Sequence, residues 1–113
     1  MWTDSHCHLN RLDLTPYQGD LDQALSVARA AGVDRFLCVA VDLDDHPVLS
    51  DLARRHADVG ISVGVHPCED LAMLSRATVD TLVQLGQGDA VWAIGETGLD
   101  YHYSADSAEV QKT

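Results

Sequence analysis

Short apolar segments alternate with helix-like segments along the chain, and this alternation is the strongest constraint on its fold. Segments with the composition of strands lie at residues 2–6, 35–41, 60–65 and 90–94. Residues 35–41 form an apolar run between Asp34 and Asp42, which is typical of a strand buried on both faces. Because strands that alternate with helices are joined by right-handed crossovers, we expect a parallel sheet.

Helical patterns separate these strands, and a further helix follows the last one. Helices are expected at 20–31, from Pro47 onward, at 76–85 and from Asp106, where Glu109 completes a capping box. Asp20 is expected to cap the first helix, with Gln23 completing a second capping box. In the third helix, Val79, Leu82 and Val83 are expected to face inward.

The length of the chain limits the architectures that this pattern can form. With 113 residues, it suffices for one small domain. Two arrangements remain open: a doubly wound open sheet, or part of an eight-stranded β/α barrel. A complete barrel needs about 250 residues, so this chain would supply four of its eight units. No glycine-rich phosphate loop follows the first strand, which argues against a nucleotide-binding fold.

The composition is acidic and restricts the partners of the chain. Asp and Glu number 18 against seven Lys and Arg, giving a net charge of −11. We therefore expect no basic nucleic-acid-binding patch, and a DNA substrate would be held through metal ions or through other parts of the protein. No apolar run is long enough for a membrane span and no signal peptide opens the chain, so we expect no membrane partner and a cytoplasmic location.

Polar residues follow each of the expected strands. His6 and His8 end the first, Asp42 follows the second, His66 the third and Glu96 the fourth. Carboxyl ends of parallel strands meet at one edge of the sheet, where α/β barrels build their active sites. The sequence therefore predicts a site at this edge.

The spacing of the two histidines indicates a metal site. Residues i and i+2 of a strand point to the same side, so His6 and His8 can bind one cation, or they are two incidental histidines. Glu96 offers two carboxylate oxygens that can bridge two metals, or it is an ordinary loop acid. His66 could orient substrate, bind a phosphate oxygen or transfer a proton, or it is hydrogen-bonded within its loop. Asp4, Asp42 and Asp100 are expected to support the loops rather than bind metal.

Three sequence blocks together resemble one known family, the TatD-type metal-dependent deoxyribonucleases. The blocks are Asp4-Ser5-His6-Cys7-His8-Leu9-Asn10, Gly64-Val65-His66-Pro67 and Ile94-Gly95-Glu96-Thr97-Gly98-Leu99-Asp100-Tyr101. They occur in the order of the family, each at the end of an expected strand. The resemblance covers essentially the whole chain, which covers somewhat under half of the usual length of the family. Cys68, after Pro67, departs from the family pattern, and we assign it no role.

The resemblance implies a fold, cofactors and an activity. The fold is the N-terminal half of a (β/α)8 TIM barrel, and a complete site holds two divalent ions, Zn, Mn or Mg. It assigns His6 and His8 to one ion, Glu96 to the bridge and His66 to the substrate side of the catalytic centre. The implied reaction is hydrolysis of phosphodiester bonds in DNA. The family also takes two histidines and an aspartate from later strands, beyond Thr113.

Two other functions remain open at this point. A barrel of the same type could hydrolyse another ester, such as a misacylated tRNA, because substrate contacts come largely from later loops. A half-barrel could also persist as a non-catalytic binding module. We expect residues 1–113 to be a single incomplete domain that is marginally stable alone, pairs with itself or aggregates, and is inactive in isolation.

Overall fold

The computed structural model describes residues 1–113 and contains one sheet with helices in the intervening segments. The strands are β1 (Trp2–Cys7), β2 (Val33–Cys38), β3 (Val59–Val63) and β4 (Val91–Ile94). The helices are α1 (Leu21–Ala30), α2 (Asp45–Arg55), α3 (Leu71–Arg76), α4 (Val79–Leu85) and α5 (Ala108–Gln111). All strand pairs are parallel, in the order β1-β2-β3-β4. The predicted parallel α/β fold is confirmed.

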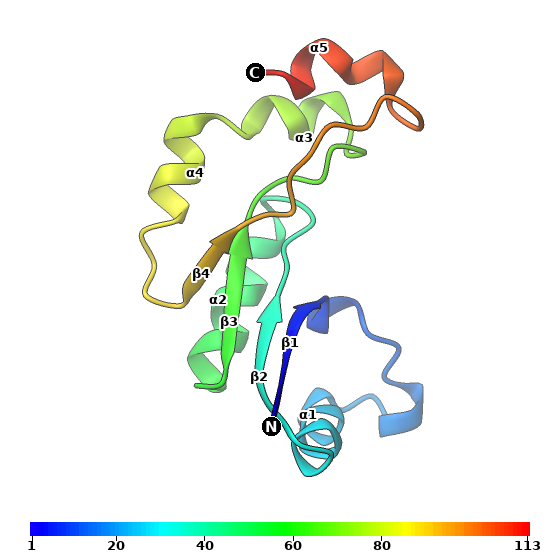
Figure 1. The fold of residues 1–113 in the computed structure, drawn as a ribbon, viewed down its shortest axis with the longest axis vertical. Coiled ribbons are helices and arrows are strands. Elements are labelled where there is room, and N and C mark those ends of the chain that lie inside the picture. Colours follow the sequence, from blue (N-terminus) through cyan, green and yellow to red (C-terminus); the bar gives the residue numbers. More distant parts are fainter.

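The order of the strands distinguishes the two architectures left open by the sequence. A doubly wound sheet reverses its strand order at a switch point, whereas a barrel adds each strand beside the previous one. Here consecutive strands are neighbours throughout. Helix α2 lies behind β2 and β3, and no helix passes in front of the strands (Figure 1). This arrangement, with helices on one side of an ordered parallel sheet, is that of a barrel segment.

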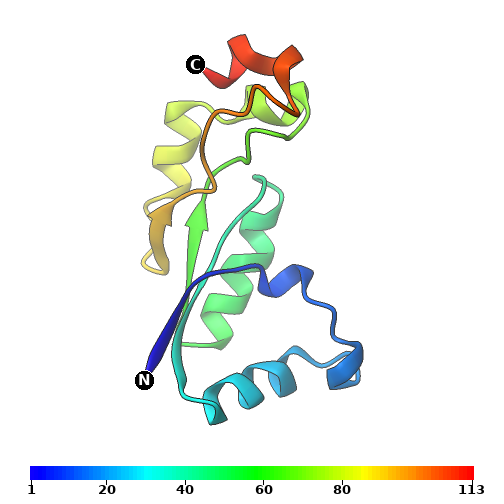
Figure 2. The same cartoon turned by 45° about the vertical axis from the view of Figure 1, so that its right-hand side comes forward.

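The core lies between β2, β3 and the first two helices. Its fully buried side chains include Leu25 of α1, Leu49 of α2 and Ile61 of β3. Phe36 of β2 joins them, and it pairs in register with Val59 of β3. The turned view in Figure 2 shows α2 running along the sheet while the chain extends upward to α3 and α5. The central strands are therefore the best-supported part of the sheet, and they carry the groups that hold the site.

The first helix is capped as predicted, although the cap has a different partner. The side chain of Asp20 accepts a hydrogen bond from the backbone N–H of Asp22. Gln23 does not complete a capping box, because the backbone N–H of Asp20 already donates to the carbonyl of Tyr17. The predicted box at Asp106 is also wrong, since a 3-10 turn precedes α5 there.

The helix predicted at 76–85 corresponds to α4, which begins at Val79, and the separate helix α3 before it was not predicted. Thr78 lies between them and caps α4, accepting a hydrogen bond from the backbone N–H of Thr81. The prediction that Val79 and Val83 face inward is wrong, since they are 69% and 56% exposed. Helix α4 lies beside the edge strand β4 (Figure 1), and no further element covers its outer side.

None of the helices is long and apolar enough to cross a membrane.

Strand β2 is shorter than predicted, and its continuation has a separate role. The strand ends at Cys38, although Val39 and Ala40 remain buried. Beyond the strand, the N–H of Val39 donates to the Cys7 carbonyl, and the carbonyl of Ala40 accepts from the N–H of Glu96. The segment after β2 thus contacts the ends of both edge strands.

Candidate metal centre

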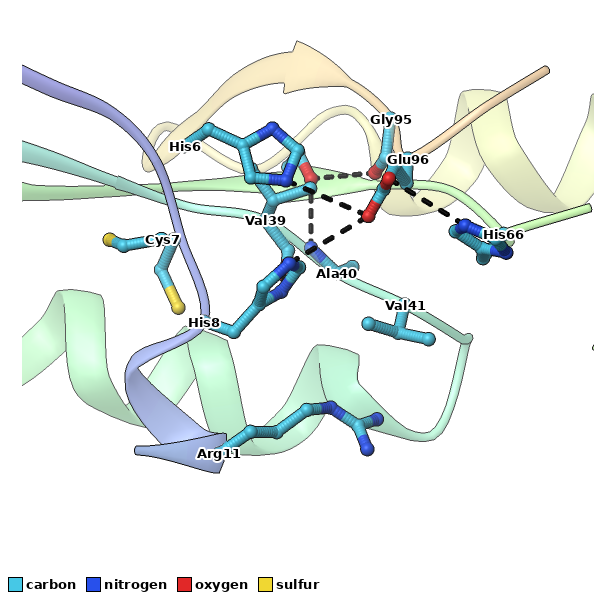
Figure 3. Close-up of polar contacts among 12 residues, drawn as sticks. His6, Cys7, His8, Arg11, Val39, Ala40, Val41, His66, Gly95 and Glu96 are labelled. Atoms are coloured by element: carbon cyan, nitrogen blue, oxygen red, sulfur yellow. Dashed lines mark hydrogen bonds and ion pairs between the residues drawn. The ribbon is translucent and has the colours of Figure 1, made fainter. Parts of the chain in front are cut away.

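Residues from both edges of the sheet meet at its carboxyl end. His6 is the last residue but one of β1 and His8 follows the strand, whereas Glu96 follows β4 on the opposite edge. In a flat sheet, these two strands would lie about 14 Å apart, given about 4.8 Å between neighbours. Yet His6 Nε2 lies 3.7 Å from Glu96 Oε2, and His8 Nε2 lies 3.8 Å from the same oxygen. The sheet therefore curves, and the three side chains converge on its concave side (Figure 3).

The converging atoms are close enough together for one metal ion to contact all three. One ligand atom from each of His6, His8 and Glu96 lies within 4.8 Å of the other two. Zinc binds histidine nitrogen and carboxylate oxygen at about 2.0–2.2 Å, so two ligands of one ion lie roughly 3–4 Å apart. The separations between histidine and carboxylate fit this range and are too long for hydrogen bonds. Nitrogen and oxygen ligands suit Zn or Mn, and Mg with more oxygen ligands.

The ring of His8 is oriented by the segment that follows β2. Its Nδ1 lies 2.8 Å from the carbonyl oxygen of Val39. A carbonyl oxygen only accepts hydrogen bonds, so Nδ1 carries the hydrogen. The lone pair of the neutral ring is then on Nε2, the atom that faces Glu96. Metal-binding histidines are commonly held in this way by a bond to the opposite nitrogen.

The ring of His66 has the opposite arrangement. Its Nδ1 accepts a hydrogen bond of 3.1 Å from the backbone N–H of Cys68, so the hydrogen of the neutral ring is on Nε2. Nε2 lies 3.8 Å from Glu96 Oε1, the carboxylate oxygen not shared with His6 and His8. His66 thus faces the site with a hydrogen-bond donor, whereas His8 faces it with a lone pair.

The backbone around Glu96 is held by the two central strands. The N–H of Gly95 donates to the carbonyl of Val63, and the N–H of Glu96 donates to that of Ala40, both at 2.9 Å. The peptide bond between Gly95 and Glu96 is cis. Its carbonyl accepts a hydrogen bond from the hydroxyl of Ser62. The carboxylate therefore projects from a backbone that is fixed on both sides.

A buried charge network supports the segment after His8. Asp45, which is 6% exposed, accepts hydrogen bonds from Arg11, Asn10 and the N–H of Val41. Burial alone would raise the pKa of Asp45, but the hydrogen bonds from Val41 and Arg11 outweigh it and hold that pKa below its ordinary value. The network joins the turn after β1 to the loop before α2. The sequence analysis did not identify it, although Asp45 is the acidic residue that opens α2.

The remaining acids near the strand ends have supporting positions, as predicted. Asp4 accepts a hydrogen bond from the N–H of His6, and Asp42 accepts one from the N–H of Asp45. Asp100 accepts from Cys68 and from backbone N–H groups of its own loop. None of the three acids belongs to the cluster of metal-binding atoms.

The fold and the site together define a class of protein. A parallel α/β barrel segment that gathers two histidines and a glutamate at its carboxyl end has the side chains from which metal-dependent hydrolases build a site. The family model described as TatD related DNase matches residues 3–113. The chain belongs to this family.

Similar proteins are named as metal-dependent hydrolases or as a TatD exonuclease. The chain is 38% identical over 104 residues to the "Uncharacterized metal-dependent hydrolase YcfH" of Escherichia coli K12, covering 92% of this chain and 38% of that protein. It is 30% identical over 101 residues to the "3'-5' ssDNA/RNA exonuclease TatD" of the same organism, covering 89% and 38%. The chain therefore spans about two fifths of the length of the relatives that it matches.

A solved structure supports the fold in the same way. The crystal structure of YJJV, a TatD homologue from Escherichia coli K12, matches with a TM-score of 0.71 and 26% identity. The match covers 98% of this chain and 42% of that one. The predicted fold class, the N-terminal half of a TIM barrel of the metal-dependent hydrolase type, is confirmed.

Proposed function

We propose that this chain provides the metal-binding strands of a hydrolase that cleaves phosphodiester bonds of DNA with divalent metal ions. The observation that carries the proposal is the convergence of His6, His8 and Glu96 at the carboxyl end of the sheet, within 4.8 Å of one another. The relative named as a single-stranded DNA and RNA exonuclease supports the choice of a nucleic-acid substrate.

In this proposal, His6 and His8 at the end of β1 would hold a divalent ion together with Glu96, whose Oε2 faces both rings. The other carboxylate oxygen of Glu96 would let it share in holding a second ion. When bound, such ions would polarise a phosphoryl oxygen and lower the pKa of a water molecule.

His66 contributes a hydrogen-bond donor to the same site. Because the Cys68 N–H holds the lone pair of Nδ1, the Nε2–H group of His66 is the one that faces the cluster. Its side chain is 34% exposed, so a substrate oxygen can reach it. We assign His66 to orienting a phosphate oxygen of the substrate beside Glu96.

The charge of the chain is consistent with substrate binding through metal ions. Of the seven Lys and Arg residues, six lie within 4.0 Å of a carboxylate. These six are Arg11, Arg29, Arg54, Arg55, Arg76 and Lys112, and Arg35 is the exception. Few cations are thus free to neutralise phosphates, and the metal centre is the main anchor for a polyanion that this chain offers.

Cleavage of a labelled single-stranded DNA oligonucleotide by the full-length protein tests the proposal. Cleavage is expected with Mn, Mg or Zn and is expected to stop with EDTA. The His8→Ala substitution is expected to lower the rate by about 100-fold or more, since losing only a hydrogen-bonded neighbour of a ligand costs about 10–100-fold. His102→Ala, which changes an exposed histidine outside the cluster, is the matched control and is expected to remain within twofold of wild type.

Two results would contradict parts of the proposal. Metal-dependent cleavage that survives His8→Ala would show that the metal does not act at this cluster. Binding of metal without cleavage of DNA, together with release of the amino acid from a misacylated tRNA, would leave the metal site in place and overturn the phosphodiester substrate.

A further inference from the structure

Ser62 is a buried hydroxyl in the middle of an otherwise apolar strand. It lies in β3 between Ile61 and Val63, and it is 1% exposed. A hydroxyl withdrawn from water is destabilising unless its hydrogen bonds are replaced within the protein. Ser62 is not one of the candidate metal ligands, so its hydrogen-bond partners indicate its role.

Both hydrogen bonds of the Ser62 hydroxyl lead toward Glu96. Its oxygen accepts a hydrogen bond of 2.9 Å from the N–H of Ala40, in the segment after β2. It donates a hydrogen bond of 2.6 Å to the carbonyl of Gly95, directly before Glu96. Since the Ala40 N–H occupies the oxygen, the hydroxyl hydrogen is directed at Gly95.

A second contact closes this chain of hydrogen bonds into a ring. The carbonyl of Ala40 accepts a hydrogen bond of 2.9 Å from the N–H of Glu96. The peptide group between Gly95 and Glu96 is thus held at both of its polar atoms by Ala40, in the segment after β2, once directly and once through Ser62. Figure 3 shows Ala40 and Gly95 on either side of the Glu96 side chain.

The position of this ring bears on the metal centre. The ring fixes the peptide group from which the Glu96 side chain departs, and that side chain places Oε2 3.7 and 3.8 Å from the two ligand nitrogens. The segment after β2 that takes part in these hydrogen bonds also contains Val39, whose carbonyl orients the imidazole of His8. The Ser62 hydroxyl therefore links the backbone that carries Glu96 to the segment that orients the ring of His8.

We propose that Ser62 is a positioning residue of the metal centre, which holds the Glu96 carboxylate at the distance from His6 and His8 that one divalent ion requires. This inference rests on the proposed metal site. Without the hydroxyl, the Gly95 carbonyl and the Ala40 N–H both lose their partner, and the backbone before Glu96 is free to shift. The affinity for metal then falls while the ligands themselves remain.

Binding of Co²⁺ to the full-length protein, followed by its visible absorption spectrum, tests the inference without an activity assay. Ser62→Ala is expected to weaken binding about 10–100-fold and to change the spectrum, as for other groups that orient metal ligands. Ser62→Thr keeps a hydroxyl and is expected to recover affinity to within about threefold of wild type. Ile61→Val, a neighbouring core substitution in the same strand, is expected to lower the melting temperature and leave Co²⁺ affinity unchanged.

The outcomes separate this inference from the metal site on which it rests. Wild-type protein that binds no Co²⁺, or binds it equally after His8→Ala, overturns both. If wild type binds and His8→Ala does not, a loss of at least fivefold in Ser62→Ala supports the role of Ser62, and a smaller loss overturns it. A Ser62→Thr protein as weak as Ser62→Ala also overturns it. If Ser62→Ala does not fold, Co²⁺ affinity is measured for Ser62→Cys, whose thiol is a poorer hydrogen-bond donor. A loss of at least fivefold then supports the role of Ser62, and a smaller loss overturns it.

Discussion

At the scale of single residues, hydrogen bonds to the backbone distinguish histidines that the sequence presents as equivalent. His8 and His66 both face the carboxylate of Glu96 at 3.8 Å. His8 donates through Nδ1 to a carbonyl, whereas the Nδ1 of His66 accepts from an N–H. The first ring therefore presents a lone pair to the site and the second presents a hydrogen. The amino-acid sequence alone does not indicate which ring nitrogen of each histidine carries the hydrogen.

Asp45 provides a prediction at the same scale, concerning stability and pH. Asp45→Asn is expected to lower the free energy of unfolding by about 1–3 kcal/mol at pH 7, because Arg11 and the Val41 N–H lose a charged acceptor. The pKa of Asp45 is lowered in the folded state, so its contribution is complete above the ordinary value of 3.8. It is lost as the pH falls through the lowered folded pKa.

Chemical denaturation of wild type and Asp45→Asn between pH 7 and pH 3 checks this prediction. The difference between the two proteins is expected to be constant down to about pH 5 and to shrink at lower pH. Asp89→Asn, at an exposed carboxylate, serves as the control with little difference at any pH. A difference that grows on acidification would contradict the assignment.

At the scale of elements, the site depends on how closely β3 approaches the segment after β4. A Cβ atom placed on Gly64 would lie 2.5 Å from the carbonyl oxygen of Glu96 and from the carbonyl carbon of Gly95. Both atoms belong to the backbone and cannot be moved by a change of rotamer. The sequence analysis identified Gly64 only as part of the block that contains His66. Gly64 leaves room for the Glu96 backbone, and this is visible only once the strands are placed side by side.

Gly64→Ala is therefore expected to displace Glu96 and weaken metal binding. We expect Co²⁺ affinity to fall by about tenfold or more, comparable to the loss of a group that orients a ligand. Gly88→Ala is the matched control, since a Cβ there would meet its nearest atoms at 3.5 and 3.9 Å, which is ordinary contact. Titration of both variants with Co²⁺ decides the question, and equal affinities would show that the backbone after β4 accommodates the methyl group.

At the scale of the whole molecule, the sheet has two open edges and apolar side chains without cover. Strands β1 and β4 each pair on one side only. The apolar residues Trp92 and Ile94 of β4 are 48% and 56% exposed, and Trp2 of β1 is 71% exposed. Unpaired strand edges with exposed apolar residues promote association between chains.

The 113-residue chain expressed alone is therefore expected to self-associate or aggregate and to melt without a sharp transition. Size-exclusion chromatography with light scattering, together with thermal melting, provides the test. Replacing Trp92 by Lys, which adds a charge to the edge strand, is expected to reduce the associated fraction. A monodisperse monomer with a cooperative melt would refute the expectation.

Much of the architecture could be predicted because it follows from local pattern. The strand–helix alternation determined the parallel sheet, and the positions of His6, His8, His66 and Glu96 after strands determined which edge carries the site. The helix predicted at 76–85 begins at Val79 instead, since periodicity does not show where a cap such as Thr78 starts a helix. The prediction that Val79 and Val83 face inward was wrong because the exposure of these side chains depends on what lies beside β4.

The sequence by itself determined the kinds of ligand and their order along the chain, because strand period and strand ends are local properties. Only the tertiary structure decided that Glu96, from the far edge of the sheet, reaches the two histidines, because that contact depends on the curvature of four strands. It also decided which histidine presents a lone pair, that Ser62 donates a hydrogen bond to the carbonyl before Glu96, and that Gly64 leaves room for the Glu96 backbone. These are contacts between residues distant in the chain, and no spacing within one segment encodes them.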